Sequence, residues 1–493
     1  MMISTFKALI PFLTLITACE ALSSNAKHVC DELVRGLGPS TVVLPSDPRY
    51  ANISTENWSQ TTWKRPACIA VPSKALQVQQ VVKTLVKKNV PFAIRSGGHS
   101  PNPLDASIDG TGVLISTGYL NVVTFDPVTK LASLGPGARW KEVYSVLDKH
   151  RVTVVGGRVL DVGVGGLLLG GGLSYLTDLY GMACDNIVSY QVVLANGDLV
   201  HATERSHRDL FWALKGGANN FGVVTEFKLK TYPIYLVWGS VRVFAATQTQ
   251  AVLQAVQAYQ SQPNKDLYAN MVLNVVPTNY TVILTMVYLK PVEKPSAFRF
   301  FYHLTPLSEY SSIMPLSTLM SLFPAATLPR WTWWTLSFKP SGTLYTQMSN
   351  LLATSPEVKT IQHLTAGTMV GTVQPINQNV ALAGRRANSV GGNVLGLEAV
   401  NQTWISLNAG WWDQKDDKKV HAAVFVLGRK IQRLVQPWAQ IDYIFMNDAN
   451  ADQGVIGSYG RVNVLRLKLV KWAYDPLGAF SRLVKGGQKV PAL

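Results

Sequence analysis

"VPFAIRSGGHS", residues 90–100, joins a short apolar run to a loop with two adjacent glycines. The apolar part predicts a short buried strand. Gly97 and Gly98 let the backbone of the loop approach another group closely. The loop also contains one imidazole, His99. The residues alone leave four roles open for it: a structural hydrogen bond, a phosphate contact, a base or a covalent attachment point.

Glycine gathers twice more in the same half of the chain, at 163–172 and at 216–222. Residues 162–172 are so rich in glycine that neither a regular helix nor a packed strand is expected there. Glycine-rich turns present successive backbone N–H groups, which bind phosphate or pyrophosphate. One cluster would indicate only a tight turn. Three clusters within about 125 residues favour a large phosphorylated cofactor that lies across several loops.

The composition is that of a folded protein with room for two domains, since 47% of the 493 residues are apolar and 15% are charged. The net charge is +16, but Lys and Arg are scattered singly. We therefore expect attraction for anionic ligands and no nucleic-acid partner.

Glycine becomes less frequent after Pro233, where strands alternate with long helical stretches. This change predicts a domain boundary near residue 235.

Several common catalytic motifs are absent from the sequence, among them GxxxxGK[ST], HExxH, CxxC and GxSxG. The run "GVGGLL" also fails the GxGxxG spacing, because its last position is Leu168. A Rossmann nucleotide site, a metal site and a serine hydrolase are therefore not expected.

The N-terminus predicts a cleaved secretory signal at residues 1–21, because Lys7 precedes a short apolar stretch and then small residues. The cut is expected after Ala21 or Ala26, and the apolar stretch is too short for a stable membrane anchor. Secretion would agree with four Asn-x-Ser/Thr sequons for N-glycosylation. They lie at Asn52, Asn57, Asn279 and Asn401.

The cysteines fit the same compartment. Cys19 would leave with the signal, and an oxidising compartment would favour a disulfide between Cys30 and Cys68. Cys184 would then be unpaired, and we expect it to be a buried, small apolar residue rather than a reactive thiol.

Five stretches together carry a family resemblance. They are "PACIAVPSKALQVQQVVK", "FAIRSGGHS", "GPGARW", "VGVGGLLLGGGLSYLTDLYGMACDNIV" and "ALKGGANNFGVVTEFKL". They resemble the FAD-binding domain of the vanillyl-alcohol oxidase and p-cresol methylhydroxylase type. With "YDPLGAF" near the C-terminus, the chain is similar to berberine bridge enzyme-like oxidoreductases, in particular to fungal members of secondary metabolism.

The resemblance implies an α+β fold in two domains. An FAD-binding domain is expected at 62–234, with 22–61 as its N-terminal part. A substrate domain with an antiparallel sheet would occupy 235–445. The C-terminal segment 446–493 would return to the FAD domain. Cys30 and Cys68 match the usual N-terminal disulfide of the family.

The resemblance also implies how FAD is held. His99 matches the histidine that bonds covalently to the flavin 8α-methyl group. Many relatives carry a second, cysteine tether, but this chain has Val159 there, so one covalent bond is expected. Val162 falls where relatives place the residue that admits oxygen, and Asn463 matches a residue that contacts the isoalloxazine. The implied FAD-binding residues are Ser96, Gly97, Gly98, His99, Ser100, Val162, Gly163, Gly165, Gly166, Gly171, Val224 and Asn463.

The sequence leaves two kinds of catalytic base open, because the family's Y-x-N-Y motif reads "FMND" at 445–448. Asp448 stands where the base-like tyrosine usually is, and a plain capping role is the alternative for it. Otherwise Tyr175, Tyr180 or Tyr459 would act as the base. Five tryptophans are candidates for an apolar substrate wall, although core packing is expected for most of them. They are Trp331, Trp333, Trp334, Trp411 and Trp412.

The expected activity is that of a secreted oxidase acting on a small apolar or aromatic natural-product intermediate. Hydride would pass to flavin N5, and molecular oxygen would reoxidise the flavin to give hydrogen peroxide. Two alternatives remain open from the sequence: an oligosaccharide oxidase, and a cyclase in which the flavin is largely structural.

Overall fold

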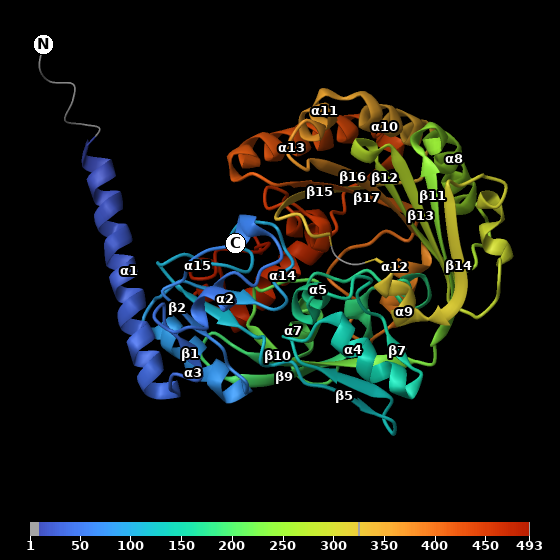
Figure 1. Cartoon of the computed structure of the whole chain (residues 1–493). Coiled ribbons are helices and arrows are strands. Elements are labelled where there is room, and N and C mark those ends of the chain that lie inside the picture. The colour runs from blue at the N-terminus through green and yellow to red at the C-terminus, as the bar shows by residue number, and fades with distance from the viewer. Residues whose placement is uncertain (1–8, 324–325, 493) are drawn as a thin grey trace, which may run out of the picture.

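The computed structural model describes residues 9–323 and 326–492. The described residues form three β-sheets, two of them before residue 235 and the third after it (Figure 1). The expected α+β class, with an antiparallel sheet in the second half of the chain, is confirmed. The change of sheet falls between the end of β10 at Tyr232 and the start of β11 at Leu236.

The first sheet contains the strand predicted from the opening stretch. Strands β2, β4 and β3 run parallel, and β1 pairs with β2 in the antiparallel direction. Helix α3, Ala75–Lys87, connects β2 to β3 and buries one apolar face, because its valines and leucines recur at helical spacing. In spatial order the strands are β1 Val42–Val43, β2 Cys68–Ala70, β4 Val113–Ser116 and β3 Phe92–Arg95.

The second sheet is antiparallel and is centred on β10. The Asn196–Gly197 turn joins β8 to β9, as expected, and Gly197 has a φ of +87°. In spatial order the strands are β5 Val123–Asp126, β6 Leu131–Leu134, β10 Val223–Tyr232, β8 Ile187–Val193 and β9 Leu199–Thr203, with β7 Thr153–Val154 also beside β10. The helices of this part are α2 Tyr50–Ser54, α4 Trp140–Leu147, α5 Val164–Leu169, α6 Thr177–Tyr180 and α7 Arg208–Ala213.

Helix α5 corrects one expectation, since it forms inside the glycine-rich run. Val164 and Leu168, one helical turn apart, are both fully buried. Their burial compensates for the low helix propensity of the glycines between them. The helix ends at Leu169, and Gly171 and Gly172, both with positive φ, follow it.

The third sheet has eight strands, and every pairing in it is antiparallel. Helices α8, α10, α11 and α13 cover its outer face, and its other face is turned toward the first half of the chain (Figure 1). In spatial order the strands are β14 Ser308–Pro315, β11 Leu236–Ala245, β13 Thr281–Tyr288, β12 Ala269–Val276, β16 Thr368–Ile376, β17 Gln402–Trp411, β15 Arg330–Phe338 and β18 Gln440–Ile441. The helices after residue 235 are α8 Thr249–Gln260, α9 Leu316–Ser321, α10 Gly342–Thr354, α11 Pro356–Gln362, α12 Asn379–Arg386, α13 Asp417–Leu434, α14 Arg461–Tyr474 and α15 Ala479–Arg482.

The C-terminal segment lies against the first half of the chain (Figure 1). Helix α14 packs on α7, and Phe480 of α15 makes an edge-on contact with Phe92 of β3, with ring centroids 5.9 Å apart. The backbone N–H of Phe92 donates to the carbonyl of Leu483. These contacts attach the last residues to the sheet that carries the opening stretch.

At the N-terminus, helix α1, Leu9–Leu37, extends away from the body of the molecule (Figure 1). Its C-terminal part is anchored by the predicted disulfide, which joins Cys30 to Cys68 of β2 and is thereby confirmed. Residues 1–8 of the predicted signal lie outside the described residues, as does the side chain of Cys19. In the described part of the chain, no helix has both the length and the apolar character needed to span a bilayer.

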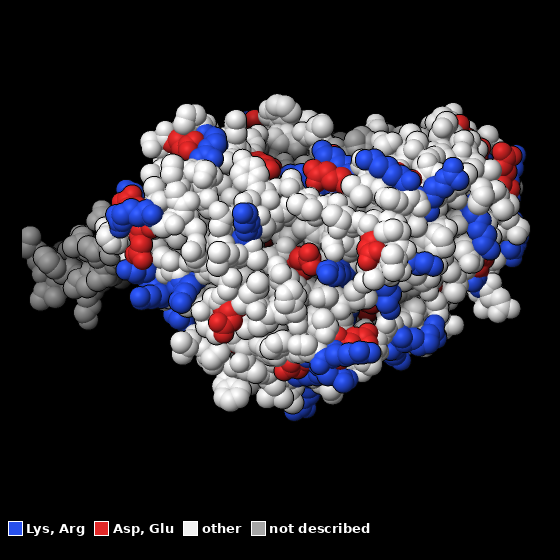
Figure 2. Space-filling model, turned by 90° about the horizontal axis from the view of Figure 1, so that it is seen from below, with Lys and Arg blue, Asp and Glu red and all other residues white. Residues whose placement is uncertain are grey.

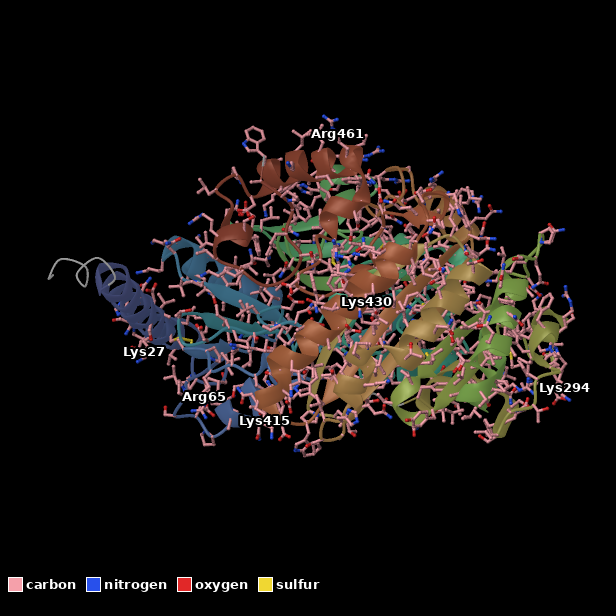
Figure 3. The ribbon with its side chains drawn as sticks, turned by 90° about the horizontal axis from the view of Figure 1, so that it is seen from above. Lys27, Arg65, Lys294, Lys415, Lys430 and Arg461 are labelled. Atoms are coloured by element: carbon pink, nitrogen blue, oxygen red, sulfur yellow. A yellow bond between two sulfur atoms is a disulfide. The ribbon has the colours of Figure 1, made fainter. Side chains whose placement is uncertain are left out.

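Basic residues are spread over the surface, as their spacing in the sequence suggests. On the face shown in Figure 2, Lys and Arg alternate with Asp and Glu and form no broad patch of one sign. The six basic residues labelled in Figure 3 come from distant parts of the chain, between Lys27 on α1 and Arg461 on α14. Lys430, one of the six, forms an ion pair with Glu357.

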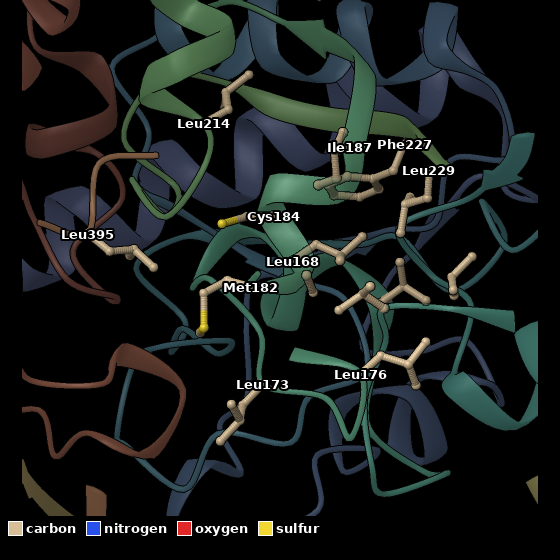
Figure 4. Packing of buried hydrophobic residues seen from close by; sticks show 14 of the residues in the cluster. Leu168, Leu173, Leu176, Met182, Cys184, Ile187, Leu214, Phe227, Leu229 and Leu395 are labelled. Carbon is tan, nitrogen blue, oxygen red and sulfur yellow. The ribbon is translucent and has the colours of Figure 1, made fainter. Parts of the chain in front are cut away.

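Cys184 lies in the largest core cluster, as predicted. It is fully buried beside Met182 and Leu168 (Figure 4). Burial raises the pKa of its thiol well above the ordinary value, so the thiolate is disfavoured. This residue therefore fills space in the core.

Candidate active site

A cavity of about 380 Å³ lies where the three glycine clusters come together. The third sheet contributes Trp333 to its wall, and residues 445–449 contribute a further segment. Ten of the twelve residues predicted to bind FAD line this cavity. They are Ser96, Gly97, Gly98, His99, Ser100, Val162, Gly163, Gly165, Gly166 and Val224.

Two of the glycine clusters touch through their backbones. A Cβ atom on Gly97 would lie 2.5 Å from the Cα and N atoms of Gly163, and a Cβ on Gly163 would lie 2.3 Å from the N atom of Gly97. No side chain fits at either position without moving the backbone. Glycine is therefore required at both positions because the two backbones lie so close together. The backbone conformation does not require it, since neither residue has a positive φ.

Ser96 ties the two loops together. Its hydroxyl donates to the carbonyl of Pro136 and accepts from the backbone N–H of Gly165 at 3.1 Å. The backbone N–H groups of Gly97, Gly98, His99 and Ser100 donate to no other group of the described chain. Four adjacent amides without partners at a cavity wall fit an anionic ligand such as a pyrophosphate.

His99 lies at the cavity wall, with its ring stacked on Trp58 at a centroid distance of 4.3 Å and an interplanar angle of 6°. Its Nε2 atom is buried and has no hydrogen-bond partner in the described chain. Burial, with a smaller contribution from the Arg139 cation, lowers the pKa of His99 to about 4. The imidazole is therefore neutral at physiological pH and keeps a lone pair available for bonding.

Trp58 is a site residue that sequence reasoning missed. It lies between α2 and β2, and its backbone N–H donates to the carbonyl of Gly98 at 3.0 Å. It also contacts Trp331 and Trp333 of β15, at 5.2 and 5.9 Å between ring centroids. Trp58 thus joins the loop of His99 to the third sheet. Its position 41 residues before His99 carries no local signal of this contact.

Asp448 also lines the cavity. Its Oδ2 atom accepts a hydrogen bond of 3.0 Å from Nε2 of Gln374 on β16, and Oε1 of Gln374 accepts from the guanidinium of Arg158. Burial raises the pKa of Asp448, while the Arg158 cation and the bond from Gln374 act against that rise. The Asp448 side chain makes no capping hydrogen bond, so the capping role is not supported.

Asn447, the preceding residue, braces the glycine-rich loop instead. Its Oδ1 atom accepts from the backbone N–H of Gly172 at 3.1 Å, and its amide donates to the carbonyl of Gly166 at 3.2 Å. The "FMND" segment therefore does two things: it fixes the loop through Asn447 and points Asp448 into the cavity.

The other proposed bases lie outside the cavity lining. The hydroxyl of Tyr459 donates to the carbonyl of Gly216 at 3.0 Å. Tyr180 stacks on Tyr232 with centroids 3.7 Å apart, and Tyr175 lies under the guanidinium of Arg158 at 5.7 Å. Among the candidates named from the sequence, Asp448 is the one that faces the cavity.

Two residues predicted to bind FAD also lie away from the cavity wall. The side-chain amide of Asn463 donates to the carbonyls of Val394 and Tyr459, so it is engaged within the fold. Gly171, with a φ of +110°, faces the side chain of Leu395. Both positions support the loops around the site and do not line it.

Of the five tryptophans, Trp333 alone lines the cavity. Trp331 packs behind it on Trp58. Trp334 and Trp411 are buried in the core between the sheet and its helices, and Trp412 is 56% exposed. The alternating directions of side chains along β15 separate Trp333 from Trp334. Core packing therefore accounts for most of these residues, as expected.

The sequence matches known proteins over nearly its whole length. A family model described as an FAD binding domain matches residues 66–203. An FAD-dependent monooxygenase of Arthrobotrys oligospora is 34% identical over 474 residues, which cover 94% of this chain and 89% of that protein. The bifunctional solanapyrone synthase of Alternaria solani is 31% identical over 474 residues, which cover 96% and 91% of the two chains.

The fold is shared with solved structures of lower sequence identity. The BBE-like 1 protein of Physcomitrella patens superposes with a TM-score of 0.75 at 17% identity, over 94% of this chain and 99% of that one. A xylooligosaccharide oxidase from Myceliophthora thermophila C1, in complex with xylobiose, gives 0.76 at 21% identity over 94% and 99%. At these identities the likeness concerns the fold alone.

Proposed function

The chain belongs to the berberine bridge enzyme-like FAD-linked oxidoreductases with a vanillyl-alcohol oxidase-type FAD-binding domain, and we propose that it is an oxidase with one covalent flavin bond. Its substrate would be a small apolar or aromatic intermediate of secondary metabolism. The observation that carries the proposal is the neutral imidazole of His99 at the wall of a cavity built from three glycine clusters.

The residues of the cavity suit FAD. The unpartnered amides at 97–100 would bind its pyrophosphate, and the close contact of Gly97 with Gly163 leaves the cavity free of side chains there. His99, with an unpartnered ring nitrogen, would form the covalent bond, and Val159 offers no second one. When bound, FAD supplies the hydride acceptor and passes the electrons to molecular oxygen, which gives hydrogen peroxide.

Asp448 would accept the proton that leaves the substrate with the hydride. A base must be unprotonated when it meets the substrate, yet basic enough to take the proton. Burial raises the pKa of Asp448 toward the working range, and Gln374 holds the orientation of the carboxylate. Oxygen would enter past Val162, which lines the same cavity.

Secretion is part of the proposal. Cleavage after Ala21 fits the fold better than cleavage after Ala26, because Ala26 is fully buried and the side chain of Asn25 donates to the carbonyl of Lys88. The exposed residues Asn52 and Asn279 are suitable glycosylation sites.

The other two sequons are less suitable for glycosylation. Asn57 is 3% exposed, accepts a hydrogen bond from Arg95 and donates one to the carbonyl of Ala106, so its side chain is not accessible for a glycan. The side-chain amide of Asn401 donates to the carbonyl of Gln260, and its Oδ1 atom accepts from the backbone N–H of Gln378. We do not propose a glycan at Asn401 either.

The flavin bond is tested by acid precipitation of the purified protein. The pellet of the wild type should stay yellow, whereas the pellet of His99→Ala should be colourless, with the flavin in the supernatant. A matched control is His363→Ala on the substrate domain, outside the cavity lining, which should keep the yellow pellet. A colourless wild-type pellet would refute the covalent bond.

The oxidase reaction is tested with isotopically labelled oxygen, because relatives carry the name monooxygenase. An oxidase releases the label as peroxide and leaves the product unlabelled.

Each of the two alternative activities predicts a different measurement. Robust peroxide formation with a mono- or disaccharide panel would favour the oligosaccharide oxidase, and a flavin that stays oxidised during anaerobic turnover would favour the cyclase.

A further inference from the structure

Arg158 is a cation in the wall of the cavity that has few partners within the protein. A guanidinium carries five N–H donors. The described chain provides Arg158 with one hydrogen bond, to Oε1 of Gln374, and with the face of Tyr175 at 5.7 Å. No carboxylate of the described residues forms an ion pair with it. The side chain is half-buried and lines the cavity.

Buried arginines elsewhere in this chain are paired. The guanidinium groups of Arg95, Arg242 and Arg330 form ion pairs with Glu56, Glu309 and Asp417 respectively. A charge that loses water without gaining a counter-ion is costly. Arg158 differs from these three because its free donors open onto a ligand cavity. An anionic atom of a ligand would be the counter-ion that Arg158 does not find in the described chain.

The neighbouring carboxylate does not fill that role. Gln374 stands between Arg158 and Asp448, with its amide nitrogen on Asp448 and its carbonyl oxygen on Arg158. This arrangement keeps cation and carboxylate in one network without a direct pair. Asp448 is thereby free for proton transfer, while Arg158 keeps donors without a partner in the wall of the cavity.

We propose that Arg158 binds an ionised oxygen of the substrate, so that the substrate class is an acidic organic molecule, such as an enol, a phenol or a carboxylic acid. The proposal rests on the oxidase function stated above and narrows it. The rest of the cavity wall contains Val159, Leu173, Phe445 and Trp333, which suit an apolar or aromatic body attached to that oxygen. A neutral sugar would leave the cation unpaired.

Binding to matched probes tests the proposal without turnover. The probes are 4-hydroxycoumarin, which is an enolate at neutral pH, its uncharged 4-methoxy ether, and coumarin-3-carboxylate. Calorimetric titration of the wild-type holoprotein should show the enolate or the carboxylate binding at least about tenfold more tightly than the ether, as a charge-assisted hydrogen bond requires. The stronger of the two anions identifies the kind of acid.

Variants assign that preference to Arg158. In Arg158→Gln the anion and the ether should bind within about twofold of each other, and Arg158→Lys should keep part of the preference, since it keeps the charge but loses the planar fork. The control Arg429→Gln removes an exposed arginine on α13 and should match the wild type. Unfolding curves check that each variant is folded. If Arg158→Gln does not fold, the wild-type and Arg158→Lys titrations still decide the question.

Equal binding of anion and ether by the wild type would overturn the proposal, as would an anion preference that survives in Arg158→Gln. The rival role is an action of the charge on the flavin itself. In that case Arg158→Gln would shift the flavin reduction potential and leave the anion preference unchanged. Failure of the proposed oxidase function can be told apart from failure of this proposal. It would show as absent peroxide or a colourless acid pellet, while the preference of Arg158 for the anionic probes would remain.

Discussion

His99 and Asp448 face the same cavity, and burial moves their pKa values in opposite directions. The pKa of His99 falls to about 4, and that of Asp448 rises. In both residues the uncharged form is favoured, because the cavity wall replaces water. A neutral imidazole suits a covalent bond, and a carboxyl group of raised pKa suits proton transfer. Burial in the same cavity wall thus suits His99 for a covalent bond and Asp448 for proton transfer.

The raised pKa of Asp448 predicts a pH-dependent cost in stability. The folded state binds the proton more tightly than the unfolded state, so stability is full below the unfolded pKa of about 4 and is lost as pH rises through the folded pKa. Asp448→Asn should therefore melt at a higher temperature than the wild type at pH 7, and this difference should shrink toward pH 4. Turnover should fall by about a hundredfold or more.

The control for this prediction is Asp442→Asn, an exposed carboxylate in the same segment. Besides burial, the Arg158 cation and the hydrogen bond from Gln374 act on the pKa of Asp448. A lower melting temperature for Asp448→Asn at pH 7, with the same difference at every pH, would contradict the account.

At the scale of elements, the site depends on two glycine loops that meet without side chains. The loop after β3 and the turn before α5 approach through Gly97 and Gly163, and Ser96 fastens them. Strands β2, β4 and β3 of the first sheet are parallel, so their C-terminal ends lie at the same edge of the sheet. The loops that follow them therefore lie close together, next to the third sheet. Backbone amides are the main ligands that such an arrangement offers.

Gly97→Ala should separate these loops, because its Cβ would lie 2.5 Å from the backbone of Gly163. Overpacking of this kind costs about 1–3 kcal/mol. We expect a lower melting temperature and a lower ratio of flavin to protein absorbance after purification. The control Gly118→Ala meets only the Ser116 hydroxyl, at 3.7 Å, and should retain both properties. Full flavin content in Gly97→Ala would show that the close contact is not needed.

At the scale of the whole molecule, a buried ion pair connects the first half of the chain to the second. Asp178 on α6 forms a buried ion pair with Lys265 and accepts a hydrogen bond from the backbone N–H of Asn377. Burial alone would lower the pKa of Lys265, but Asp178 and Tyr259 raise it above the ordinary value. The pair therefore keeps its charges and fixes α6 against the segments around the third sheet.

Asp178→Asn should weaken this connection by about 3–5 kcal/mol, since it leaves the Lys265 cation buried without a counter-ion. The melting temperature should fall, and the double variant Asp178→Leu with Lys265→Met should recover part of the loss. Lys141→Met breaks the exposed pair with Asp161 and should cost at most about 1 kcal/mol. Equal effects of the buried and the exposed changes would contradict the argument.

Much of the fold and part of the site could be predicted from the sequence. Glycine clusters, the Asn196–Gly197 turn and the apolar run of β3 are local patterns that record what the backbone must do at each place. The expected α+β class and the disulfide between Cys30 and Cys68 are confirmed. Helix α5 was missed, because tertiary burial of Val164 and Leu168 outweighed the low propensity of the glycines.

The sequence by itself determined where the backbone can approach a cofactor, because glycine and turn residues act over a few neighbours. The tertiary structure decided which side chains meet in the cavity. Trp58, Gln374 and Arg158 reach His99 and Asp448 from different sheets and loops. Tyr180 and Tyr459, which equally suit proton transfer by residue type, are engaged elsewhere. Such contacts depend on strand register and domain docking across hundreds of residues, and no local pattern encodes them.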